Sequence, residues 1–116
     1  MNSISARPPR RLYRIVKTVE PQPDDFKSNF ALGKRPLART DPEDELSISV
    51  FAELEQAEFW ARRHNWKLGQ YVAVLHIPPR ARVQVWRSQL EIAGHHSLKG
   101  DPKRLASYVV RVVKLR

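Results

Sequence analysis

Two serines lie where a strand-like pattern changes into a helical one, and at such a junction small hydroxyl groups can hydrogen-bond a ligand. Between Leu46 and Val50, apolar residues alternate with Ser47 and Ser49, which is typical of a strand. Apolar spacings of three and four then predict a helix over about 52–64, with Ser49 as its N-cap. Backbone N–H groups at a helix start are unpaired and favour anions. The serines therefore either present hydroxyls to a ligand or are simply solvated.

An arginine and two adjacent histidines are the other side chains with chemistry to offer. Arg14 shares one face of a strand pattern with apolar residues, so it lies either at the rim of the core or in a cleft that holds an anion. His95 and His96 follow Gly94 and suit phosphate contacts or acid–base chemistry near neutral pH; the alternative is a turn with solvated histidines. Adjacent strand residues point to opposite faces and the chain has no cysteine, so we expect no metal site.

The elements that must position these residues predict an α+β fold. Strands are expected over 12–19, 46–50, 71–77, 83–86 and 108–115, and a short second helix is expected from Asp101 to Leu105. Together they predict a mixed, largely antiparallel sheet with one main helix and a short second helix. The predicted organisation is a flexible N-terminal arm over 1–10 and a single α+β domain over 11–116.

In chain order, three pieces resemble a small bacterial ADP-ribosyltransferase-like domain. They are Arg14 in an early strand, the run Ser47-Ile48-Ser49 before a helix, and the run Gln89-Leu90-Glu91 further on. The resemblance implies an ADP-ribosyltransferase-like fold with a cleft for NAD, and transfer of ADP-ribose to a protein or nucleic acid, as in toxins and effectors. It implies that Arg14 holds the NAD phosphates while Ser47 and Ser49 support the cleft, so the Arg14 and Ser49 side chains must share one side of the sheet.

The same resemblance makes Glu91 and Gln89 the catalytic residues. Glu91 grips the nicotinamide ribose, where a carboxylate stabilises an oxocarbenium-like centre, and Gln89 faces the acceptor. His95 and His96 join the cofactor site. An antitoxin or immunity protein is the implied protein partner.

Charge supports a second hypothesis. The chain has 116 residues and a net charge of +9, which attracts nucleic acid or another acidic macromolecule. The alternative function is therefore a non-catalytic basic nucleic-acid-binding or accessory protein. Its surface consists of Arg80, Arg82 and Arg87 around Trp86, together with Arg111 and Lys114. No apolar run approaches the roughly 18 residues that span a bilayer, and no signal peptide is evident, so we expect a cytoplasmic protein without a membrane partner.

Overall fold

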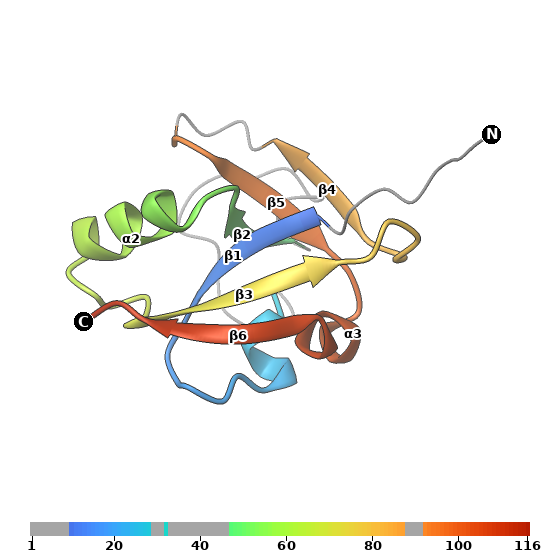
Figure 1. The fold of residues 1–116 in the computed structure, drawn as a ribbon, viewed down its shortest axis with the longest axis horizontal. Coiled ribbons are helices and arrows are strands. Elements are labelled where there is room, and N and C mark those ends of the chain that lie inside the picture. Colours follow the sequence, from blue (N-terminus) through green and yellow to red (C-terminus); the bar gives the residue numbers. More distant parts are fainter. Residues whose placement is uncertain (1–9, 29–31, 33–46, 88–91) are drawn as a thin grey trace.

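The computed structural model describes residues 10–28, 32, 47–87 and 92–116, and Figure 1 shows how their elements follow one another. The elements are β1 (Arg10–Val16), the 3-10 helix η1 (Pro23–Phe26), β2 (Ile48–Phe51), α2 (Leu54–Arg63), β3 (Tyr71–Ile77), β4 (Gln84–Arg87), β5 (His95–Lys99), α3 (Pro102–Ser107) and β6 (Val109–Lys114). The described part is therefore an α+β fold, as predicted, with one longer and one shorter α-helix.

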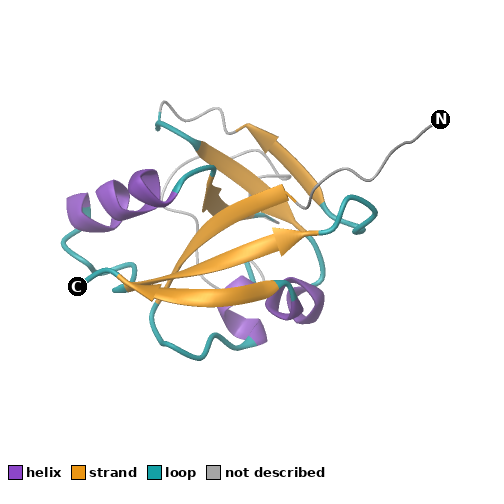
Figure 2. Cartoon of the chain, viewed as in Figure 1, coloured by secondary structure: helices purple, strands orange, loops and turns teal. Residues whose placement is uncertain are grey.

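The six strands form one sheet in the order β4-β5-β2-β1-β3-β6 (Figure 2). Every pairing between the described strands is antiparallel, so the sheet is not mixed as predicted. The nearly continuous apolar run of β3 lies between β1 and β6, and its residues 72–75 are buried, which is the central position that its sequence indicates.

Alternation along β1 gives the sheet two covered faces. Leu12 and Val16 point to the face that packs against η1 and α3, through Phe26 and Leu105. Tyr13 and Ile15 point to the opposite face, which α2 covers with Ala57 and Ala61. The core therefore lies on both sides of the sheet, with a different helix on each side.

The join between β1 and β2 is the weakest in the sheet, and we call it the seam. These strands pair at one position, Tyr13 with Phe51, whereas β1 pairs with β3 at seven positions and β2 with β5 at four. The sheet thus consists of two three-stranded halves, β4-β5-β2 and β1-β3-β6, whose backbones pair at one position while both core clusters pack across the join. Beyond that point the two strands need other groups to satisfy their backbone.

The start of α2 differs from the prediction because Ser49 lies inside β2. The N-cap is Glu53, whose side chain and that of Gln56 form a reciprocal capping box, with the Glu53 N–H donating to Gln56 Oε1 at 3.0 Å. The turn before β5 docks on this helix start, because the Ala52 N–H donates to the Gly94 carbonyl at 3.0 Å. Gly94 has φ +71°, and a Cβ built there would overlap the Gln56 side chain.

Other boundaries also differ. Strand β1 begins at Arg10, which the sequence had assigned to the arm, and ends before Lys17. The connection after β1 contains η1, which begins at Pro23, a residue suited to the first position of a helix. The alternative in which the two histidines occupy a turn is wrong, because they begin β5, in the middle of one half of the sheet.

Candidate functional site

Arg14 lies at the seam and joins three elements. It directly follows Tyr13, the one position at which β1 pairs with β2. Its Nη1 donates to the main-chain carbonyl of Ser49 in β2 at 2.9 Å, and its Nε donates to the carbonyl of Asp25 in η1 at 3.2 Å. A side chain thus supplies the hydrogen bond that backbone pairing would supply in a continuous sheet. The planar guanidinium suits this task, since its donors point in fixed directions.

Arg14 is a half-buried cation. Burial lowers the pKa of Arg14 to about 10, while the negative charge of Asp25 acts in the opposite direction. The guanidinium therefore stays charged at neutral pH. The Asp25 carboxylate accepts from the Gln22 N–H at 2.7 Å, and neither ion pair found within the described residues includes Arg14. A half-buried cation whose described partners are neutral carbonyls is a place where an anion is favoured.

The structure does not bring the serine side chains to Arg14. Ser49 lies between Ile48 and Val50, which belong to the same core cluster as the neighbours of Arg14, so its side chain points to the other face of the sheet. Ser47, two residues earlier, precedes the strand. The expectation that Arg14 and the Ser49 side chain share one side of the sheet is therefore wrong, and so is the serine-supported NAD cleft that the resemblance implies. Ser49 contacts Arg14 only through its main-chain carbonyl.

The side chains of the two histidines of β5 point to opposite faces of the sheet, as expected for adjacent residues of a strand. His95 is buried, pairs with Phe51 and meets its ring edge-on with centroids 5.5 Å apart. His96 pairs with Val50 on the face of Arg14, and its Nδ1 lies 2.9 Å from the Gly94 carbonyl oxygen. Val50 is 0% exposed and lies between the strands of Arg14 and His96, so these two residues form no common open cleft.

The two catalytic predictions, Gln89 and Glu91, lie outside the described residues. Within the part that is described, no group of three His, Cys, Asp or Glu side chains is placed to hold a metal ion. In the same residues, no helix has both the length and the apolar character that crossing a membrane requires.

An open hollow of about 450 Å³ lies beside α2, away from the predicted residues. Its walls are Glu55, Gln56, Phe59, Trp60, Arg63, Ile92 and Ala93. Phe59 is 59% exposed, which is unusual for so large an apolar side chain. Neither Arg14 nor the serines reach this hollow, so the sequence-based site and the hollow are separate features.

The basic residues proposed for nucleic acid do not form one surface. Arg87 and Trp86 lie on β4 and Arg111 and Lys114 on β6, and these strands are the two opposite edges of the sheet. Arg111 is opposite Val74 and Lys114 is opposite Tyr71, so they also point to different faces. The predicted surface is therefore divided by four intervening strands.

Sequence reasoning missed the residues that the fold brings to the sites. The Asp25 carbonyl is a partner of Arg14 because η1 folds back under β1, and no local pattern signals that contact. Arg11 and His76 become cross-strand neighbours through the register of β1 with β3. The sequence matches no protein-family model, no curated protein resembles it significantly, and no solved structure matches the fold.

Proposed function

We propose that this chain is an ADP-ribosyltransferase-like domain that binds NAD at the seam, with Arg14 as the residue that holds the pyrophosphate. The observation that carries the proposal is the Arg14 guanidinium, half-buried and cationic at the point where the two halves of the sheet part. Pyrophosphate oxygens are strong acceptors for such a group, and arginine binds them through paired donors.

The hydrogen bonds of Arg14 leave donors for a ligand. The two bonds to Ser49 and Asp25 use two of the five N–H donors that a guanidinium carries. They fix its orientation, so that an anion meets a donor already aligned. Such preorganisation lowers the cost of binding.

The serine hydroxyls have no part in this revised proposal. Ser49 acts through its carbonyl, which positions Arg14, and its side chain is exposed on the other face. Glu91 at the nicotinamide ribose and Gln89 at the acceptor remain in the proposal on the resemblance alone. NAD, when bound, supplies an ADP-ribose unit whose C1′ bond to nicotinamide is exchanged for a bond to the acceptor, with release of the acceptor's proton.

Isothermal titration of the folded protein with NAD is the test. We expect the wild type to bind, Arg14→Ala to lose binding, and Arg14→Lys to keep a weakened part of it because a charge remains. Arg87→Ala is the matched control, because it removes one positive charge from an exposed arginine that pairs with His96 and so lies on the same face of the sheet as Arg14. Circular dichroism establishes that each variant is folded.

Two results would contradict the proposal. One is a folded wild type that gives no heat with NAD. The other is equal loss of binding in Arg14→Ala and Arg87→Ala, which would show that only net charge matters. If binding is found and depends on Arg14, loss of transfer in Glu91→Ala without loss of NAD binding would support its catalytic role.

A further inference from the structure

Positive charge is concentrated in the second half of the chain. After Glu58 the sequence holds twelve lysines and arginines but only two acidic residues, Glu91 and Asp101. Folding adds charge from the first strand to this set, because β1 lies next to β3 in the sheet.

These cations meet on one face at one end of the β1-β3-β6 half. Arg11 of β1 is directly opposite His76 of β3, so their side chains are on the same face. Arg111 of β6 is opposite Val74, two residues before His76 and therefore on that same face. Three neighbouring strands thus contribute one basic side chain each.

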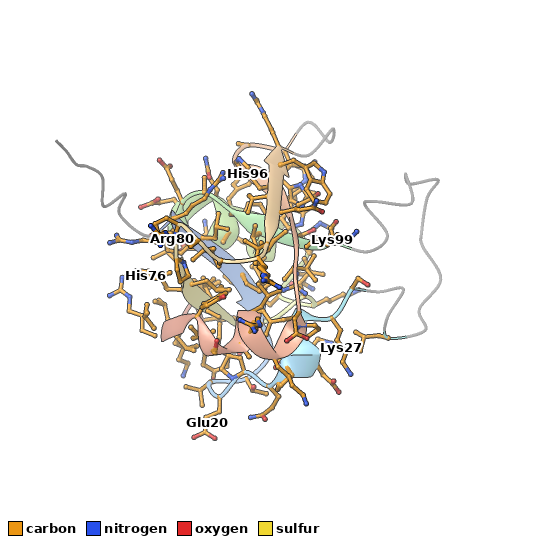
Figure 3. The ribbon with its side chains drawn as sticks, turned by 90° about the vertical axis from the view of Figure 1, so that its right-hand side faces the viewer. Glu20, Lys27, His76, Arg80, His96 and Lys99 are labelled. Carbon is orange, nitrogen blue, oxygen red and sulfur yellow. The ribbon has the colours of Figure 1, made fainter. Side chains whose placement is uncertain are left out.

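The loop after β3 extends this cluster, which we call the basic strip: Arg11, His76, Arg80 and Arg111. Arg11, Arg80 and Arg111 are exposed and His76 is half-buried. Figure 3 shows His76 and Arg80 on the same side of the molecule, with Lys27 and Lys99 on the other. Neither of the two ion pairs within the described residues involves a residue of the basic strip.

Such an arrangement favours an extended anion over an isolated one. Two exposed guanidinium groups, Arg11 and Arg111, lie on one face of neighbouring strands, and a bound anion can accept from both. Three strands spaced about 4.8 Å apart span about 10 Å, a length over which duplex nucleic acid presents several phosphates. The strip also lies on the opposite face from Arg14, so both sites can be occupied together.

We propose that the basic strip binds the phosphate backbone of a nucleic acid, and that nucleic acid is the macromolecule on which the domain acts. The second clause rests on the proposed function, whereas the binding itself does not. The contacts are to phosphates and carry no base specificity. An acidic protein as the partner is the competing outcome.

Fluorescence anisotropy with a labelled 20-nucleotide RNA and a DNA duplex, in graded salt, tests this proposal. The test variant is Arg11→Gln/Arg111→Gln. The matched control is Lys67→Gln/Arg116→Gln, which removes the same charge from exposed residues that follow α2 and β6, at the other end of β3. If the test variant proves unfolded, Arg80→Gln, in a loop after β3, replaces it.

We expect wild-type binding that weakens steeply as salt rises. In the test variant the slope of log K against log salt should fall by about 2, one unit for each lost phosphate contact, and affinity should fall roughly tenfold. The control should keep the wild-type slope. Equal slopes in the two variants, or no binding by the wild type at 50 mM salt, would overturn the proposal.

The two proposals fail separately. NAD binding that persists in Arg11→Gln/Arg111→Gln, with nucleic-acid binding lost, supports both sites. Nucleic-acid binding that survives Arg14→Ala while NAD binding is absent overturns the proposed function but leaves the basic strip in place. An RNA or duplex that binds wild type and test variant equally overturns only the strip.

Discussion

Gly94 offers the sharpest test of how strand β5 is anchored to the start of α2. We predict that Gly94→Ala destabilises the protein by about 2–3 kcal/mol. A non-glycine residue in the left-handed region costs about 1–2 kcal/mol, and φ at Gly94 is +71°. The new methyl group also displaces Gln56, whose side chain caps the Glu53 N–H, and losing a cap costs about 1 kcal/mol.

Thermal unfolding with Gly94→Ala, Gln56→Ala and the double variant separates the two contributions. We expect Gly94→Ala to lower Tm by about 8–12 °C, at roughly 4 °C per kcal/mol for a domain of this size. In the Gln56→Ala background the overlap is absent, so Gly94→Ala should cost only the backbone strain. The double variant should therefore show a coupling of about 1 kcal/mol, since the two residues are in contact.

Gly100→Ala is the control for this experiment. Its Cβ would meet the side-chain ends of Val83 and Leu105 at 2.9 and 3.3 Å, and these ends can move. We expect a cost of about 1 kcal/mol, the lower end of the penalty for overpacking. A Gly94→Ala variant within about 0.5 kcal/mol of wild type, or an effect that simply adds to that of Gln56→Ala, would contradict the predicted contact between Gly94 and Gln56.

Three further predictions concern the supports of the sheet and the charge at the seam. Leu105→Ala should cost about 2–5 kcal/mol in chemical denaturation, because Leu105 is 1% exposed and anchors α3 in the core; a cost below 1 kcal/mol would contradict this packing. Asp101→Ala should cost about 1 kcal/mol, because its side chain accepts from the Arg104 N–H at the start of α3, and Asp101→Asn should restore most of it. NAD binding measured between pH 6 and 11 should stay constant up to pH 9 and fall as the pH rises through about 10, where Arg14 loses its proton. As the pH rises through about 10 stability should rise, because the unfolded chain keeps the Arg14 proton to a higher pH and so binds more protons than the folded one.

Local patterns predicted the elements well because each element obeys a local rule. The alternation of β1, the apolar run of β3, the amphipathic stretch of α2 and the Asp101-Pro102 start of α3 depend only on neighbouring residues. The same local logic failed at β5, where two histidines after a glycine resemble a turn. A polar sequence becomes an interior strand when other strands pair with both of its edges, as β4 and β2 do with β5. Those partners come from distant parts of the chain, so the sequence around the histidines does not reveal them.

The candidate site shows the same division. Alternation alone predicts that Arg14 shares a face with apolar neighbours, and the structure places it there. The seam, the Asp25 carbonyl and the opposite facing of Ser49 were not predictable, because they follow from strand register and from the fold of a long connection. Residues that are close in a motif need not share a face when strands have a period of two.

The order of amino acids is enough to predict an α+β chain with a basic second half, the strand and helix periods, and an arginine beside apolar neighbours. The parting of the sheet beside that arginine, and the meeting of Arg11, His76 and Arg111 on three strands, appear only in the folded molecule. Hydrophobic periodicity depends on adjacent residues, whereas strand register depends on how both faces of one sheet are covered at the same time. Charges far apart in the chain then meet where the packing of the core puts them.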